Sequence, residues 1–488
     1  MLGARMKHRT WYLIKTNDAG EIVMARKDYL GHLRAGKELT RGQQLSMILS
    51  LSIPAILAQI SSVIMQYIDA SMVGQLGANA SASIGLVAST TWLIGNVCQA
   101  MAIGFTVQVA QQIGAGRNDL ARSAVRHGLL FILLLAAVLS AGCVVLSGQL
   151  PGMLGGAADI RPDATRYFRV YAFAIPALAM NYAASGMLGA SGNMKVPSML
   201  NILMCFLDVV FNFLFIFPTR EIQIGTTAFT MPGAGLHVTG AALGTAMAEV
   251  VCTLVMLLIL LFRSPMLRLR REKAAGSLKQ ELRTAGKISL PVGFEAVVMG
   301  MGYVMYTKII APLGTVAIAA NSFAATAESV CYMPAFGISQ AATTIIGQTV
   351  GAGRKDMNVR LSRLIVGLGM LIMLGCSSLL FLFAPQMIGM LSPDPEIRAL
   401  GTALLRIIAF EEPFYAAAVV TNGVFRGRGD TLVPSIMTLI SMWGVRIPAS
   451  AWCAVDFGLK GSWAAVGLEL VFRGVIFLVR LRRRNRRL

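Results

Sequence analysis

The chain has 488 residues, of which 56% are hydrophobic and only 14% are charged, and its mean hydropathy is +0.66. One soluble core cannot bury so much apolar surface, so the composition predicts an integral membrane protein. The net charge of +20 comes from basic residues in short runs between apolar segments. That pattern is typical of cytoplasmic membrane loops and argues against nucleic-acid binding.

The cysteines and histidines argue against an enzyme. The seven cysteines are dispersed, mostly within apolar runs, and never form a CxxC pair. The four histidines, His8, His32, His127 and His237, lie in tails or at the ends of segments. Neither a zinc site nor a Cys–His or Ser–His catalytic pair is expected, and we predict no enzymatic activity and no cofactor.

One internal repeat organises the chain. Residues 111–119, QQIGAGRND, return as residues 348–356, QTVGAGRKD, at a separation of 237 positions. The same separation relates Pro54 to Pro291, Gly77 to Gly314, Arg126 to Arg363, Arg169 to Arg406, Phe173 to Phe410, Pro176 to Pro413, and Pro197 to Pro434. Because these pairs keep one register without a gap, they predict an internal duplication.

Residues 1–46 are polar and basic, and they are predicted to form a cytoplasmic tail. Residues 1–15 contain no apolar run long enough for a cleaved signal peptide. Residues 11–14 and 22–25 flank the turn-forming sequence NDAG at 17–20, which could close a small hairpin. A disordered tail is the alternative, and the sequence favours neither.

Twelve apolar runs follow, each long enough, at roughly 20 residues, to cross about 30 Å of hydrocarbon as a helix. The expected spans are 47–72, 82–112, 122–148, 164–189, 196–217, 239–262, 286–311, 315–347, 358–384, 398–424, 432–455 and 459–481. The predicted fold is therefore an all-α integral membrane protein with twelve transmembrane helices in two parallel six-helix repeats.

Basic loops alternate with weakly charged ones, and basic loops mark the cytoplasmic side. This pattern predicts that both termini are cytoplasmic and that the two halves share one topology, related by an axis along the membrane normal. The expected division is a tail at 1–46, a first lobe at 47–262, a basic linker at 263–285, a second lobe at 286–481, and a basic tail at 482–488. The RLRREK run in the linker would also suit anionic lipid headgroups, as an alternative to a plain orientation signal.

Polar residues inside the first lobe's helices are candidates for ion coupling, because intramembrane carboxylates are costly. Gln59, Ser62, Gln66 and Asp69 follow one another at helical spacing and share one face, which either lines a cavity or forms a polar seam between packed helices. In the fifth span, Asp208 and Asn212 are four residues apart, so the amide can reach the carboxyl. That pair either carries a proton or serves packing.

The second lobe has a different set of acids as candidates for ion coupling: Glu295, Glu328, and the adjacent pair Glu411 and Glu412. None of them has an acidic counterpart 237 positions earlier, so the duplicated halves have diverged in their ionisable groups. Glu295, Met299, Tyr303 and Tyr306 share one helix face, which could offer an organic cation a carboxylate and aromatic rings. Glu249 and Glu469 are also candidates, though nearer in pattern to ordinary helix-packing sites.

No GxxxxGK[ST] motif is present, so an ion gradient is expected to supply the energy for any transport. From about Ser52 to Val475 the chain resembles the multidrug and toxic compound extrusion family of secondary transporters. The resemblance rests on Pro54, DASMVGQLG at 69–77, both GAGR turns, ESVCYMPAFG at 328–337, and the stretches 186–197 and 423–434.

The resemblance implies two six-helix lobes around a central cavity that opens alternately to either face, and an antiporter that exchanges amphipathic, often cationic compounds for protons or sodium. It implies a coupling role for Asp69. Relatives commonly carry Asn and then Asp in the fifth helix, whereas this chain has Asp208 and then Asn212. Glu295 and the pair Glu411 and Glu412 lie near acids of the family's second lobe, and sodium would be expected near Glu295 and Glu411.

We therefore expect a monomeric, multi-pass exporter of small organic cations in the inner (plasma) membrane, driven by protons or sodium, with the lipid bilayer as its surroundings. A flippase for a lipid or lipid-linked precursor is the main alternative, although such flippases favour a cationic cavity and the midplane residues here are mainly acidic. Arg446 and Lys308 are the exceptions. A membrane scaffold that transports nothing would not need so many intramembrane carboxylates.

Overall fold

The computed structural model describes residues 12–16, 22–26, 28–224, 227–269 and 275–488. The first half of the chain contains α1 (Tyr29–Arg34), α2 (Arg41–Gly74), α3 (Ala78–Gly114), α4 (Asn118–Leu146), α5 (Leu150–Met153), α6 (Arg161–Ala190), α7 (Lys195–Ile216) and α8 (His237–Leu258), which the π-helical turn η1 (Ile259–Arg263) extends. Strands β1 (Tyr12–Thr16), β2 (Ile22–Arg26), β3 (Pro218–Ile224) and β4 (Thr227–Ala234) form two hairpin-like pairs outside the helices.

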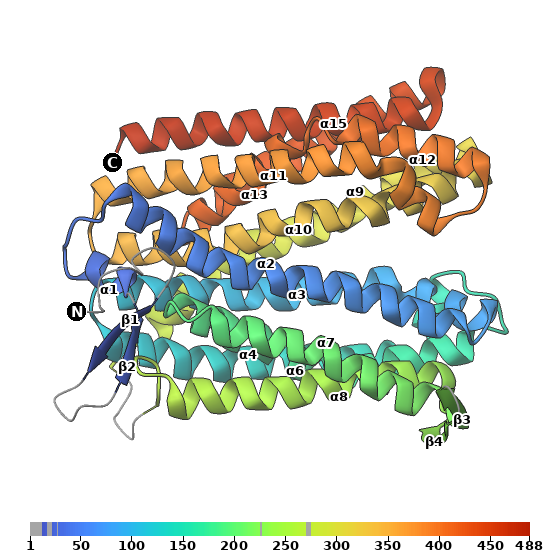
Figure 1. The fold of residues 1–488 in the computed structure, drawn as a ribbon, viewed down its shortest axis with the longest axis horizontal. Helices are drawn as coiled ribbons and strands as arrows, with labels where there is room; N and C mark the ends of the chain where they lie inside the picture. The colour runs from blue at the N-terminus through green and yellow to red at the C-terminus, as the bar shows by residue number, and fades with distance from the viewer. Residues whose placement is uncertain (1–11, 17–21, 27, 225–226, 270–274) are drawn as a thin grey trace, which may run out of the picture.

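The second half contains α9 (Leu278–Ile310), the 3₁₀ turn η2 (Ala311–Leu313), α10 (Thr315–Gly351), α11 (Lys355–Leu391), α12 (Pro395–Ile408), α13 (Glu412–Gly427), α14 (Leu432–Ser441), the π-helical turn η3 (Met442–Arg446) and α15 (Ile447–Arg486). The long helices lie side by side along one axis, with α4, α6, α7 and α8 grouped at one side of the molecule and α11, α12, α13 and α15 at the other (Figure 1). We call α2–α8 the first half and α9–α15 the second half.

Each of the twelve expected spans falls on helical structure, with two irregularities. The tenth span is divided at residues 409–411 into α12 and α13, just before Pro413, which has no N–H to donate to residue 409, although its counterpart Pro176 lies inside the unbroken helix α6. The last two spans are joined within α15 across a kink at Gly458, which has the left-handed φ of 60° that glycine tolerates. Among the described residues, seven helices are long and apolar enough to cross a membrane by length and composition alone.

The N-terminal segment is ordered where the structure describes it. Strands β1 and β2 pair antiparallel, with Tyr12 opposite Arg26 and Thr16 opposite Ile22, so the hairpin interpretation is confirmed. The connecting turn at 17–20 lies outside the described residues. Helix α2 begins at Arg41, six residues before the expected span, because Thr40 and Gln43 form a capping box.

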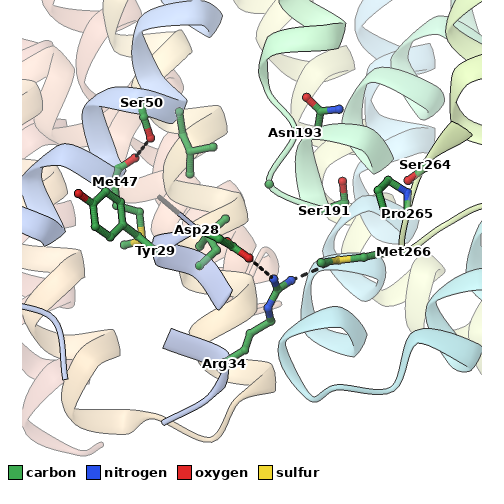
Figure 2. A pocket seen from close by; sticks show the side chains of 13 residues that line it. Asp28, Tyr29, Arg34, Met47, Ser50, Ser191, Asn193, Ser264, Pro265 and Met266 are labelled. Carbon is green, nitrogen blue, oxygen red and sulfur yellow. Dashed lines mark hydrogen bonds and ion pairs between the residues drawn. The ribbon is translucent and has the colours of Figure 1, made fainter. Parts of the chain in front are cut away.

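Helix α1 packs over the junction of the two halves. Leu30 and Leu33 are buried in an apolar cluster that also contains residues of α2 and α10. A cavity of about 320 Å³ lies between α1, the start of α2, the turn at 191–193 and residues 264–266 (Figure 2). At its edge Arg34 lies between Asp28, at 3.4 Å, and the Met266 sulfur, at 3.3 Å. This short helix therefore contacts both halves at one end of the molecule.

The halves meet along α3 with α9, α2 with α10, and α3 with α10, and glycines let the backbones approach closely. A Cβ on Gly104 of α3 would lie 2.4 Å from the Ala285 carbonyl oxygen of α9. A Cβ on Gly337 of α10 would lie 2.6 Å from the Ile56 nitrogen of α2. Small residues at helix interfaces are how membrane helices gain van der Waals contact without a hydrophobic driving force.

The two repeated GAGR turns have the same backbone conformation. Helix α3 ends at Gly114 and α10 at Gly351, and the second glycine of each turn has positive φ, 74° at Gly116 and 68° at Gly353. In the second turn the Arg354 guanidinium donates to Asp356, and this hydrogen bond holds the pKa of the Asp356 carboxyl below its usual range. The repeat seen in the sequence is thus a repeat in the structure.

Candidate functional site

The first half brings two of the predicted acids together through one amide. Asn212 of α7 donates from Nδ2 to Asp69 Oδ1 of α2 at 2.9 Å, and to Asp208 Oδ2, one turn earlier in α7, at 3.2 Å. Asp208 and Asn212 are fully buried, whereas Asp69 is partly exposed. The i, i+4 spacing in α7 places the carboxyl and the amide on one face, and α2 supplies the second carboxyl from 143 residues away.

Helix α8 leaves the space that this group needs. A Cβ on Gly244 would lie 2.1 Å from Asn212 Oδ1, so any larger residue there would displace the amide. Asp208 Oδ1 and Asn212 Oδ1 have no hydrogen-bond donor within the described chain. Two carboxyl groups and a free amide oxygen therefore lie together, and such oxygens can accept either a proton or a small monovalent cation.

The rest of the predicted stripe on α2 does not join this group. Gln59 and Ser62 are half-buried and Gln66 is exposed, and no hydrogen bond links them to Asp69 among the described residues. A separate acid, Glu249 of α8, is buried and accepts from Asn181 Nδ2 at 2.7 Å. Sequence spacing placed these residues on one face of α2 but could not show which of them meets α7.

In the second half the four residues predicted to share one face of α9 have different surroundings. Glu295 Oε2 accepts a 2.6 Å hydrogen bond from the Ser435 hydroxyl of α14, and Met299 is half-buried one turn later. Tyr303 is 43% exposed and its ring stands edge-on to Trp92 of α3, with centroids 6.1 Å apart. Tyr306 instead packs against the apolar cluster of the second half. On this face, Glu295 thus has a polar partner and Tyr303 is exposed.

The remaining acids lie where α10 faces α13. Glu412, at the first turn of α13, is fully buried, and neither of its carboxyl oxygens has a hydrogen-bond partner within the described residues. Its neighbour Glu411 lies against Gly467 of α15, where a Cβ would come within 2.4 Å of Oε1. Glu328 of α10 is half-buried. The rings of Tyr332 and Tyr415, each about one turn beyond one of these acids, are 5.8 Å apart and show that the two helices face each other there.

Predicted sodium sites near Glu295 and Glu411 stay predictions. The contacts of these two residues differ, because Glu295 bonds to α14 and Glu411 faces α15. In the described ranges no group of three or more His, Cys, Asp or Glu side chains is placed to hold a metal ion.

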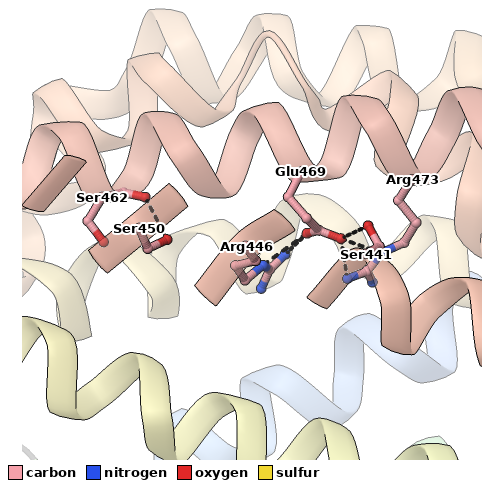
Figure 3. Close-up of polar contacts among 6 residues, drawn as sticks. All are labelled: Ser441, Arg446, Ser450, Ser462, Glu469 and Arg473. Atoms are coloured by element: carbon pink, nitrogen blue, oxygen red, sulfur yellow. Dashed lines mark hydrogen bonds and ion pairs between the residues drawn. The ribbon is translucent and has the colours of Figure 1, made fainter. Parts of the chain in front are cut away.

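A buried charge cluster in the second half surrounds Glu469, which the sequence placed nearer in pattern to helix-packing sites. The Glu469 carboxylate of α15 accepts from Arg446 at 2.9 and 2.6 Å on Oε2, and from Arg473 at 2.7 Å and the Ser441 hydroxyl on Oε1. Figure 3 shows Arg446 on one side of the carboxylate and Arg473 with Ser441 on the other. The i, i+4 spacing of Glu469 and Arg473 was the available signal, but it could not show that Arg446 joins them.

This cluster carries one carboxylate and two guanidinium groups, so it has one net positive charge. All three charged side chains are buried. Removing the carboxylate would leave two buried cations without a counter-ion, and an uncompensated buried charge costs several kcal/mol. We infer that Glu469 keeps α14, η3 and α15 together.

We therefore expect Glu469→Gln to destabilise the protein by about 3–5 kcal/mol, since an amide cannot neutralise either arginine. The measurement is thermal unfolding of detergent-purified protein, with Glu396→Gln at an exposed position of α12 as the matched control. An unchanged melting temperature for Glu469→Gln would contradict a structural role for this cluster.

Comparison with known proteins places these features in a family. The family model described as MatE matches residues 54–214 and 291–452, which together are well over half of the chain and correspond to its two halves. The probable multidrug resistance protein NorM of Thermotoga maritima is 27% identical over 440 residues, covering 88% of this chain and 91% of that protein.

Solved structures match over almost the whole fold. The outward-facing conformation of a multidrug resistance MATE family transporter aligns with a TM-score of 0.83 at 20% identity, covering 92% of this chain and 99% of the other. The Vibrio cholerae MATE transporter VcmN in its bent form aligns with a TM-score of 0.82 at 18% identity, covering 91% and 98%. At this identity the structural matches show the fold alone, including its twelve-helix arrangement.

Proposed function

Because the chain belongs to the MatE family of membrane transporters, we propose that it is a secondary antiporter that exports amphipathic organic cations in exchange for protons or sodium. It is not an enzyme. The observation that carries the proposal is the Asp69, Asn212 and Asp208 group, in which a partly exposed carboxyl meets a buried one through a single amide. The names of curated relatives as multidrug resistance proteins support the export of drug-like small molecules.

The exchange follows from competition at this group. Asp69 is the partly exposed member of the group, so it can receive the coupling ion. The hydrogen bond from Asn212 keeps the Asp208 carboxyl close to Asp69, so both carboxyls act on the same ion. When the carboxylates are charged they attract a cation, and when they are protonated or bind sodium that attraction is lost. Ion entry and substrate release then become two results of one binding equilibrium.

The second half supplies the other candidate contacts for the substrate. Glu295, Glu328, Glu411 and Glu412 add negative charge, and Tyr303 offers an exposed ring that a cation can approach. The reversed order of Asp208 and Asn212 relative to the family leaves an amide bonded to Asp69. We propose that this arrangement retains ion coupling with the roles of the two α7 positions exchanged.

One observation favours the flippase alternative. The buried Arg446, Glu469 and Arg473 cluster has an excess positive charge in the second half, and an anionic headgroup would complement it. The carboxylates of both halves outnumber these two arginines, so we retain the cation exporter as the main proposal.

We also propose that the protein is a monomer in the plasma membrane with both termini cytoplasmic, and that its lobes divide at 47–262 and 286–481, joined by the linker at 263–285. The arrangement in which α1 and the C-terminus lie at the same end of the helices supports this topology (Figure 1). The basic residues at 482–484 and 486–487 support the cytoplasmic side for that end.

A topology experiment follows from this proposal. In a variant without native cysteines, Arg354→Cys should react with a membrane-impermeant maleimide only from the cytoplasmic side, because the GAGR turn is a basic loop. Asn79→Cys at the opposite end of the helices is the matched control and should react only from outside. Labelling of position 354 in intact cells would reverse the orientation.

We expect Asp69→Asn and Asp208→Asn each to reduce gradient-driven export to the level of empty vesicles while preserving insertion. The amide keeps the size of the carboxyl but cannot exchange a proton or carry charge. Counterflow and gradient-driven uptake in proteoliposomes, with imposed pH or sodium gradients, measure this and identify the coupling ion. Asp159→Asn, at an exposed position, is the control; full transport by both site variants would exclude this group as the coupling site.

Binding of a lipophilic cation should tighten as pH rises, because charged carboxylates hold the cation and protonated ones do not. With one competing proton the affinity changes by about tenfold per pH unit below the titration point. Fluorescence polarisation of an ethidium-like dye on purified protein between about pH 5.5 and 8.5 tests this. A flat profile, or tighter binding of an anionic lipid analogue than of the dye, would favour the flippase.

A further inference from the structure

The geometry points to Gln111 and Gln348 as a pair of gate residues: their side chains bind the two halves together at the ends of α3 and α10 and must release them when the transporter opens at that end. The inference rests on the proposed function in one respect, namely that transport requires the halves to separate there. It concerns positioning of the halves and no contact with the substrate.

Each glutamine reaches across to the other half. Gln111 of α3 donates from Nε2 to the Gly427 carbonyl oxygen at 3.0 Å, and Gln348 of α10 donates from Nε2 to the Ala190 carbonyl oxygen at 2.7 Å. The donors are 237 positions apart in sequence, and so are the acceptors. The duplication has therefore produced one hydrogen bond twice, related by the approximate two-fold symmetry of the halves.

The acceptors are the last residues of helices. Ala190 ends α6 and Gly427 ends α13, and the final carbonyls of a helix have no partner inside it. Each glutamine thus caps a helix of the opposite half, and that cap exists only while the halves are in contact.

Two glycines make the approach possible. A Cβ on Gly114 would lie 2.2 Å from the Gln348 carbonyl oxygen, and a Cβ on Gly351 would lie 1.9 Å from the Gln111 carbonyl oxygen. These contacts are also exchanged by the repeat, because Gly114 and Gly351 are themselves counterparts. The backbones of α3 and α10 therefore meet directly where the glutamine side chains cross, and this end of the junction is closed.

The glutamine pair differs from two neighbouring polar contacts between the halves. Gln108 donates to the Glu281 carbonyl at 3.0 Å and Thr344 to the Gly189 carbonyl at 3.3 Å. Their counterparts in the repeat are Ile345 and Val107, which have no polar side chain. A contact shifts the equilibrium between the closed and open conformations only if it is made in one of them. The two glutamine caps are such contacts, and the repeat places one in each half.

The test uses a reporter cysteine at this closed junction, Thr344→Cys, in a variant without native cysteines. Thr344 is buried, so a maleimide reaches it only when the halves separate. Labelling rates in nanodiscs, where both faces are accessible, are compared for Gln111→Leu, Gln348→Leu, the double variant, and the control Gln340→Leu at an exposed position of α10. A second reporter, Ser377→Cys, is buried within the second half and reacts only on general unfolding.

Loss of one net hydrogen bond should raise the labelling rate at position 344 about fivefold, and loss of both about 25-fold. The control substitution and the Ser377→Cys reporter should show no change. Rates at position 344 within about twofold of the parent in the double variant would overturn the inference. An equal rise at both reporters would also overturn it, because the glutamines would then serve general stability.

If a leucine variant does not fold, Gln348→Glu replaces it, since the carboxylate keeps the shape of the side chain but repels the Ala190 carbonyl and should also speed labelling. The readout does not depend on transport. If the proposed function is wrong, export will be absent but the labelling differences will remain. If the gate is wrong, export will be normal and the labelling rates will not change.

Discussion

The structure depends on the direct contact between the ends of α3 and α10. There the two repeats approach so closely that only glycine fits at positions 114 and 351, and the glutamine three residues before each glycine reaches a helix end in the other half. Because the two halves have the same topology, a symmetric contact of this kind needs only a few residues from each half to join them. It closes one end of the junction and leaves the polar groups of each half free to specialise.

The halves have used that freedom differently. The first half gathers its acids, so that Asp69 and Asp208 share Asn212 within one small group. The second half divides its acids between two places, with Glu295 bonded to Ser435 of α14 and with Glu328, Glu411 and Glu412 near the contact of α10 and α13. Carboxyl groups held together compete for one ion, whereas separated ones offer several positions to a cation of variable shape.

Buried charge in the second half has a structural role as well. Glu469 is held by two arginines and a serine, and that cluster joins α14, η3 and α15 at the point where the helix is π-helical. A π-helical turn widens the backbone, and here it places Arg446 against the carboxylate. The same chain thus contains carboxylates that are neutralised permanently and carboxylates that remain available to ions.

The sequence by itself determined the membrane setting, the twelve helical spans, the duplication and the family resemblance, because apolar length and a fixed repeat separation are local or strictly periodic properties. It also placed Asp208 and Asn212 on one face of α7. Only the tertiary structure decided that Asn212 bonds to Asp69, that Arg446 joins Glu469, and that Gln111 caps α13. Helical periodicity tells which residues share a face, but the helix that each face meets depends on packing between segments that are far apart in the chain.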